Sequence, residues 1–211
     1  MTPASLYRLS GLALVLASAL FAVAEVISFS LFTVQGGEEY DLTEIAQTGT
    51  FMLQSFLTLL AGTLLLGGLM GLYLRQSEAA GRLGLAGFVP AFFGTSLVVG
   101  DFYTNTFVTP MVAREAPAFL DNPLSGILQV WLPFNFSLLA LSWLLLAVAT
   151  LRARVYPRGT SWLLLAATLL ALVPIPLSNL PFHAAVALVG LRLLRSREAP
   201  ARGRRRSKQH R

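Results

Sequence analysis

The chain has 211 residues, of which 55% are hydrophobic and only 12% are charged, with a mean hydropathy of +0.67. A soluble domain has about a quarter charged residues, so this composition excludes an ordinary soluble globule and predicts a single bundle surrounded by lipid. The lack of cysteine excludes disulfides, thiolate nucleophiles, thiolate metal sites and covalently attached haem.

Five long segments with at most one charged residue follow one another along the chain. A membrane-spanning helix needs about 20 mostly apolar residues. The first four segments each predict one span, at about residues 9–33, 50–74, 83–108 and 124–151. The fifth is interrupted by Pro174, Pro176 and Pro181, which break helices. It predicts two short helices at about 160–174 and 181–195, or a re-entrant hairpin that returns to the same side. The expected fold class is therefore all-α, a polytopic transmembrane bundle of about six spans.

Charge placement predicts how these spans are oriented. With both ends in the cytoplasm, 15 of the 16 Lys and Arg residues lie on the inner side and only Arg114 lies outside. The outer segments carry acids instead, namely Glu38, Glu39, Asp41, Glu44, Glu115 and Asp121. This distribution follows the positive-inside rule. Residues 1–195 are thus expected to form the bundle.

Residues 196–211 are expected to form a disordered basic tail in the cytoplasm. Its positive charge predicts contact with anionic lipid headgroups at the membrane surface. The tail lacks interleaved aromatic residues, so nucleic acid is not an expected partner.

The N-terminal segment allows a second interpretation. Arg8, an apolar stretch and Ala22-Val23-Ala24 together resemble a signal peptide with a cleavage site. Cleavage would make Glu25 the N-terminus and leave five spans. The apolar run continues to Val34, well past that site, which favours an ordinary first helix.

Small residues repeat at heptad spacing on two predicted helices, and each series ends in an acid. The series are Gly11, Ser18 and Glu25 on the first helix, and Gly87, Gly94 and Asp101 on the third. Small residues indicate a helix–helix contact face, so both acids are predicted to point into the bundle. On the second helix, Gly67, Gly68 and Gly71 include a Gly-x-x-x-Gly spacing, which lets helix backbones approach closely.

The polar side chains of the predicted spans gather in the outer half of the bilayer. Glu25 and Asp101 are expected at similar depth, because each lies about two-thirds along an outward-running helix of 1.5 Å rise per residue. An ionised acid at the bilayer centre costs about 2.5–3.5 kcal/mol, so it needs a polar surrounding. The candidate polar pocket, open to the outside, comprises Glu25, Gln54, Asp101, Asn105, Asn135 and His183. The alternative is a polar network that fixes helix register.

No motif in the sequence specifies a reaction, a cofactor or a metal. His183 is the one histidine near a predicted span, and one histidine makes neither a zinc site nor a bis-histidine haem site. There is no metal-ligand cluster, no Ser–Lys or Ser–His pair within a span and no phosphate-binding loop. An intramembrane enzyme is therefore the least favoured function.

The pattern favours a non-enzymatic bundle, without cofactor, that binds a small or lipidic molecule or assists another membrane protein. One alternative is a small-solute or proton-coupled transporter that uses Glu25 and Asp101. Another is a structural subunit of a larger membrane assembly.

Three runs of residues carry a resemblance to known proteins. They are Tyr7-Arg8-Leu9-Ser10-Gly11, the stretch from Tyr73-Leu74-Arg75-Gln76 to Gly81-Arg82-Leu83-Gly84, and Leu151-Arg152-Ala153-Arg154-Val155-Tyr156-Pro157-Arg158. In these runs the chain resembles small bacterial multi-pass membrane proteins of unknown function. The resemblance covers most of the chain in layout and implies the bacterial inner (cytoplasmic) membrane. It implies no activity and transfers no catalytic residue.

Overall fold

The computed structural model describes residues 3–34, 42–120, 127–173 and 175–195, and in these ranges it is helical without any strand. The elements in chain order are α1 (Pro3–Val34), α2 (Leu42–Ala46), α3 (Gly49–Tyr103), the π-helical turn η1 (Thr104–Val108), α4 (Thr109–Glu115), the 3-10 turn η2 (Pro117–Phe119), α5 (Ile127–Ala153), α6 (Arg158–Leu170) and α7 (Leu180–Leu194). The all-α prediction is confirmed over the described residues.

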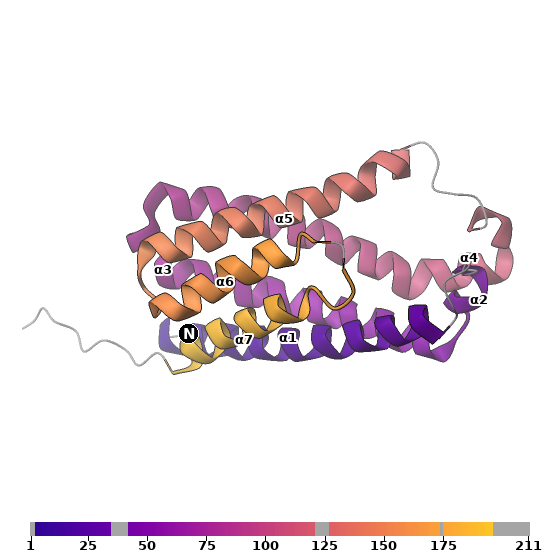
Figure 1. Cartoon of the computed structure of the whole chain (residues 1–211), viewed down its shortest axis with the longest axis horizontal. Coiled ribbons are helices and arrows are strands. Elements are labelled where there is room, and N and C mark those ends of the chain that lie inside the picture. The colour runs from indigo at the N-terminus through magenta and orange to yellow at the C-terminus, as the bar shows by residue number, and fades with distance from the viewer. Residues whose placement is uncertain (1–2, 35–41, 121–126, 174, 196–211) are drawn as a thin grey trace, which may run out of the picture.

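The long element α3 consists of two arms joined at a corner. At Gly81 the backbone has φ 53° and ψ −138°, a conformation that glycine adopts at little cost because it has no Cβ. The chain turns back at this residue, so the arm before it and the arm after it run in opposite directions (Figure 1). The first arm contains the segment predicted as a span at 50–74, and the second arm together with η1 contains the one predicted at 83–108.

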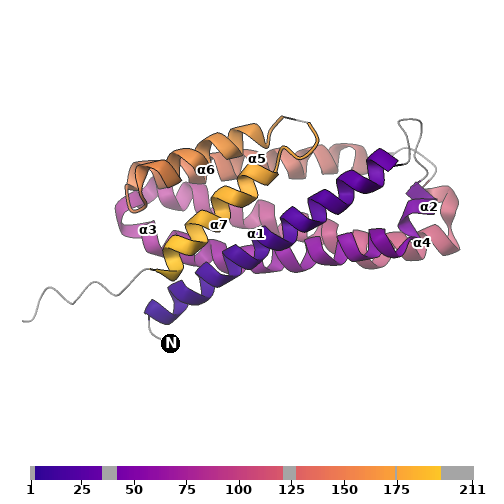
Figure 2. The same ribbon diagram turned by 60° about the horizontal axis from the view of Figure 1, so that its bottom comes forward.

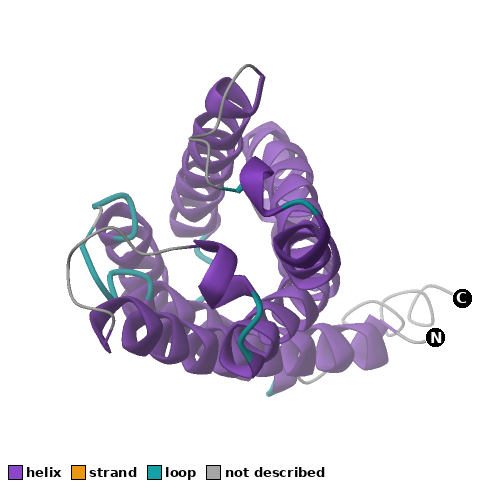
Figure 3. Cartoon of the chain, turned by 90° about the vertical axis from the view of Figure 1, so that its right-hand side faces the viewer, coloured by secondary structure: helices purple, strands orange, loops and turns teal. Residues whose placement is uncertain are grey.

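The helices run roughly along one long axis, with the chain reversals at the two ends of the bundle (Figures 1 and 2). The start of α1, the Gly81 corner, the α5–α6 turn and the end of α7 lie at one end, on the left in Figure 1. The short helices α2 and α4 lie at the opposite end. Figure 3, viewed from that opposite end, shows the main helices nearly end-on.

Three helices are long and apolar enough to cross a membrane, by length and composition: Ala4–Leu31, Gly49–Glu115 and Pro133–Ala153. Their outward side chains are large and apolar. Val23, Phe56, Phe93 and Leu141 are all between 52% and 63% exposed. Soluble monomers rarely show an extended apolar surface of this kind, whereas lipid tails are compatible with it.

The helices α6 and α7 form a hairpin that is shorter than its neighbours. They have 13 and 15 residues, which at about 1.5 Å per residue gives lengths of about 20 and 22 Å. The hydrocarbon core of a bilayer is about 30 Å thick. The turn between the two helices therefore lies partway along the bundle (Figure 2). These helices occupy the segments expected at 160–174 and 181–195.

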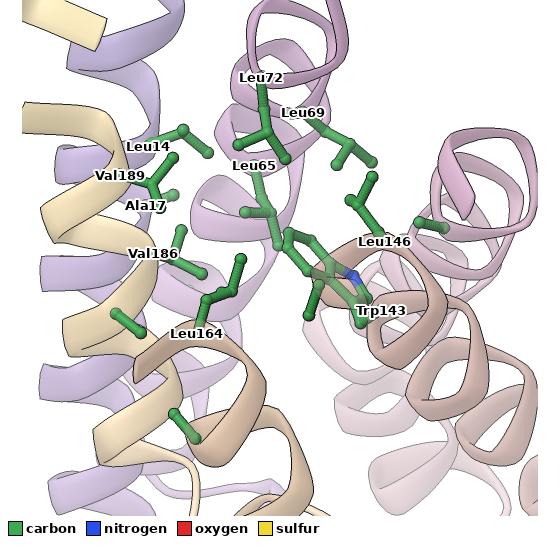
Figure 4. Close-up of a cluster of buried hydrophobic side chains, with 14 of the residues drawn as sticks. Leu14, Ala17, Leu65, Leu69, Leu72, Trp143, Leu146, Leu164, Val186 and Val189 are labelled. Carbon is green, nitrogen blue, oxygen red and sulfur yellow. The ribbon is translucent and has the colours of Figure 1, made fainter. Parts of the chain in front are cut away.

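The hydrophobic core occupies the half of the bundle into which the hairpin extends. Leucines from α1, α3, α5, α6 and α7 pack together there with Val186, Val189 and Trp143, and Figure 4 shows most of them. Trp143 is 3% exposed and packs inside the bundle. Its indole occupies the interior between α5 and the first arm of α3.

The two heptad series of small residues are helix contacts, as predicted. A Cβ on Gly11 would lie 2.7 Å from the carbonyl oxygen of Gly190, so α1 and α7 touch through their backbones. Gly87 and Gly94 lie equally close to the backbone of α5, at Leu146 and Leu139.

The predicted Gly-x-x-x-Gly contact on the first arm of α3 is wrong at one position. Gly67 faces open space, with nothing within 4 Å of a Cβ built there. The glycines that approach α1 are Gly68, beside Leu14, and Gly71, beside Ser10. The contact pair is thus spaced by three residues, which keeps both glycines on one helix face.

Candidate functional site

A cavity of about 580 Å³ lies beyond the tip of the α6–α7 hairpin. Its walls come from α1, both arms of α3 and α5, and the end of α6, the connecting turn and the start of α7 also line it. The cavity forms because α6 and α7 stop short of the full bundle length. The core cluster lies on the hairpin side of it.

Glu25 on α1 is the central charged residue of this cavity. Its Oε1 accepts a hydrogen bond of 3.2 Å from the backbone N–H of Asn179, and its Oε2 lies 3.5 Å from Nε2 of His183. Asn179 is the N-cap residue of α7, and no side-chain cap of its own satisfies that helix start. The N-terminal end of a helix carries free N–H groups and a partial positive charge. Glu25 supplies the missing acceptor from another helix, which explains how an acid is accommodated here.

Aromatic rings surround the Glu25–His183 pair. The His183 ring stacks on Phe21 with 5.0 Å between centroids and an angle of 8°, and Phe182 lies edge-on to Trp143 at 5.0 Å. Phe102 packs at 5.8 Å from Phe21. The five ring-bearing residues, Phe21, Phe102, Trp143, Phe182 and His183, all line the cavity. The pair of polar groups is therefore held by rings that have little freedom to rotate.

Gln54, on the first arm of α3, also lines the cavity. Its Oε1 accepts a hydrogen bond of 3.4 Å from Oγ of Ser55. Of the six residues that the sequence analysis singles out, the structure brings Glu25, Gln54 and His183 together around one space.

Asp101 and Asn135 form a separate interhelical pair. Nδ2 of Asn135 donates a hydrogen bond of 3.2 Å to Oδ2 of Asp101, which joins the second arm of α3 to α5. Asn135 is fully buried, and its Oδ1 has no hydrogen-bond partner among the described residues. Neither residue is among those that line the cavity. Glu25 and Asp101 thus bond to different partners on different helices.

Asn105 lies apart from both groups. It is exposed, on the π-helical turn η1, and its Oδ1 accepts a hydrogen bond of 3.4 Å from Thr109. The predicted pocket of six residues is therefore divided into a cavity group of three, an interhelical pair and one exposed side chain.

Sequence reasoning omits the aromatic part of the cavity. Phe21 precedes Glu25 by one helical turn and shares its face, and Phe182 is the neighbour of His183. That spacing could have indicated both residues. Trp143 and Phe102 had no such signal, because an aromatic residue on an apolar helix is usually part of the core.

A second set of buried polar side chains lies at the end of the bundle that carries the Gly81 corner. Gln76, Tyr156 and Ser161 are 0%, 6% and 1% exposed, and none of their side-chain polar atoms has a hydrogen-bond partner among the described residues. Burial raises the pKa of the Tyr156 hydroxyl above its usual range, with Arg75 acting in the opposite direction. The Arg75 guanidinium lies 5.7 Å from the centre of the Tyr7 ring.

Within the described residues, no group of three or more His, Cys, Asp or Glu side chains is arranged to hold a metal ion. The side chains of the cavity can instead offer one carboxylate, one imidazole, several amide and hydroxyl groups and a set of aromatic faces. Comparison with protein-family models, with curated proteins and with solved structures gives no match to this chain.

Proposed function

We propose that this is an integral protein of the bacterial inner membrane with both ends in the cytoplasm. The support is the clustering of charge at the ends of the helices. All described arginines except one belong to the start of α1, the Gly81 corner, the α5–α6 turn or the end of α7, which lie together in Figure 1. The exception, Arg114, is in α4 at the opposite end. The positive-inside rule then assigns the arginine-rich end to the cytoplasm.

The lengths of the helices favour four full crossings and one re-entrant hairpin over six crossings. The crossings are α1, the two arms of α3 and α5, while α6 and α7 enter from the cytoplasmic side and return to it. Both arrangements place the end of α7 inside. A topology reporter fused after Arg211 should therefore report a cytoplasmic position. A signal from the external side of the membrane would contradict this orientation.

The cavity is the basis for the function that we propose, which is non-enzymatic binding of a small or lipidic molecule from the outer side. Its volume of about 580 Å³ lies in the usual range for ligand sites, about 300–1,000 Å³. Glu25, Gln54 and His183 supply polar groups from three different helices, and most of the remaining surface is apolar. Such a combination of a few polar groups and an apolar wall is typical of ligand sites.

Transport is less well supported than binding. The interior between the cavity and the arginine-rich end is filled by the core cluster of Leu65, Leu69, Leu146 and Leu164, each at most 7% exposed. A transporter would need an alternative packing of this cluster to open the inner side. A role as a binding protein or as an assistant to a membrane complex needs no such rearrangement.

The proposed function is tested by filling the cavity. Ala140 lines it, whereas the adjacent Leu141 is 63% exposed on the outer surface of α5. Native mass spectrometry of the full chain in mild detergent should detect a bound small molecule in the unmodified protein and in Leu141→Trp. The bound mass should be lost in Ala140→Trp. An unmodified protein without any bound molecule, or equal occupancy in Ala140→Trp, would contradict a ligand in this cavity.

A further inference from the structure

We propose that the ligand of this cavity carries a positively charged amine or quaternary ammonium group on an apolar body. This inference rests on the proposed function of the cavity and adds the chemical class of the ligand. It comes from the charge of the walls, from the hydrogen-bonding groups that they offer and from their aromatic residues.

The charge of the lining residues is negative. Glu25 is the single carboxylate among the described residues that line the cavity, and no Lys or Arg is among them. A charge interacts more strongly in a low-dielectric interior than in water. An anionic ligand would be repelled by Glu25, and no Lys or Arg of the lining offsets that repulsion. A cationic ligand would complete the charge balance of the site.

Several hydrogen-bond donors on the walls are already used. The Thr58 hydroxyl donates to the Ser55 carbonyl at 2.8 Å, and the Thr168 hydroxyl donates to the Leu164 carbonyl at 2.7 Å. The indole N–H of Trp143 donates to Thr95 at 3.2 Å. The Thr58 and Thr168 oxygens keep lone pairs and can still accept. These walls therefore suit a ligand that donates hydrogen bonds, as a protonated amine does; for a quaternary ammonium group, which has no N–H, only the charge and the aromatic rings contribute.

The aromatic residues of the lining favour the same class. Phe21, Phe102, Phe136, Phe182 and Trp143 all line the cavity. The face of an aromatic ring carries a negative partial charge and attracts a cation within about 6 Å. Such rings also provide apolar area, so they accommodate the hydrocarbon part of an amphiphilic amine.

Glu25 itself can act on such a charge through space. Its Oε1 is held by the Asn179 N–H, whereas Oε2 is covered by its neighbours, lies 3.5 Å from Nε2 of His183 and has no hydrogen-bond partner among the described residues. A covered carboxylate oxygen without a donor is unfavourable. A cation in the cavity would stabilise this oxygen through space, across the residues that cover it.

Three probes of one shape test the inference. Benzyltrimethylammonium, neopentylbenzene and phenylmethanesulfonate share a benzyl group and a tetrahedral end, and they differ in charge. Saturable binding of each to the full chain in nanodiscs of zwitterionic lipid would be measured by ligand-observed NMR, with empty nanodiscs subtracted. We expect the cation to bind about ten-fold tighter than the neutral probe. We expect no saturable binding of the anion.

Variants identify the source of this preference. Glu25→Gln should reduce the affinity for the cation, leaving only the preference that the aromatic rings supply, and should leave the affinity for the neutral probe unchanged. Asp101→Asn is the matched control, because it removes an acid that does not line the cavity. It should change neither affinity. If Glu25→Gln does not fold, Phe102→Leu serves in its place. It keeps an apolar side chain but removes a ring face, so it should lower the affinity for the cationic probe and leave the affinity for the neutral probe unchanged.

The outcomes separate the inference from the proposed function. Equal or tighter binding of the neutral probe or of the anion would overturn the inference and leave a ligand-binding cavity. Unchanged cation binding in Glu25→Gln, or in Phe102→Leu when that variant is used, would do the same. No saturable binding of any probe would overturn the inference and the proposed function together.

Discussion

The contact between α1 and α7 gives the sharpest prediction for stability. Replacing Gly11 by Ala would place a Cβ 2.7 Å from the carbonyl oxygen of Gly190 and 2.8 Å from the backbone nitrogen of Leu194. Both are backbone atoms, so neither can turn away as a side chain would. The two helices must separate, and the packing of Leu14 against α7 is weakened as a result.

The magnitude follows from a matched pair of variants. Overpacking in a well-packed interior costs about 1–3 kcal/mol. The better helix propensity of Ala offsets about 0.5–1 kcal/mol of this in a helix interior. Gly67→Ala gains the same propensity without a steric cost, since nothing lies within 4 Å of its Cβ. The difference between the two variants therefore isolates the steric cost, about 1–3 kcal/mol of unfolding free energy.

The assay is reversible unfolding of the full chain in mixed micelles, with increasing sodium dodecyl sulfate and tryptophan fluorescence as the signal. Gly190→Ala provides an independent check, because its Cβ would meet the Gly11 carbonyl oxygen at 2.8 Å. It should be destabilised like Gly11→Ala. The packing argument is refuted if Gly11→Ala is as stable as Gly67→Ala.

Three further predictions use the same unfolding measurement. Asp101→Leu removes the acceptor of the buried Asn135 amide and should lower the unfolding free energy by about 1–3 kcal/mol, while adding Asn135→Leu should recover most of the loss. A single variant as stable as the unmodified protein would contradict this. Gln76→Met replaces a buried amide that has no described partner and should raise stability by about 1 kcal/mol; a loss of stability would refute it. Burial raises the pKa of Tyr156, in the turn between α5 and α6, so the unfolded chain releases this proton first. Stability should therefore fall as the pH rises above about 10, and Tyr156→Phe should reduce that slope, whereas an unchanged slope would count against it.

Much of the helical layout follows from the sequence alone. Apolar runs interrupted by charges indicated the long helices, and the proline cluster indicated the break between α6 and α7. The heptad series of small residues indicated two real contact faces. Residue spacing did not settle which glycines of the first α3 arm make the contact, because neighbouring residues point about 100° apart on a helix. Gly67 and Gly68 therefore point in different directions, and only Gly68 faces α1.

The composition of the site was less predictable, for a geometric reason. Depth along the bundle follows from the sequence, since each residue adds a fixed rise, but the direction that a helix face points depends on its neighbours. Gly11 turns one face of α1 to α7, so Glu25 meets Asn179 and His183. Gly94 turns the second arm of α3 to α5, so Asp101 meets Asn135. The two acids therefore have separate partners.

The hydrogen bond between Glu25 and Asn179 joins residues that are 154 positions apart in the chain. During synthesis α1 is made first, and its acid has no helix start to cap until α7 follows. Until then the Glu25 carboxylate lacks the Asn179 N–H that it accepts from in the folded chain, and an acid without a polar partner is unfavourable in an apolar environment. A nascent chain without α7 thus lacks the hydrogen bond from Asn179 to Glu25, and it also lacks the part of the cavity lining that α7 supplies. The cavity is consequently completed only after α7 has been made, because Asn179, Phe182 and His183 form part of its lining.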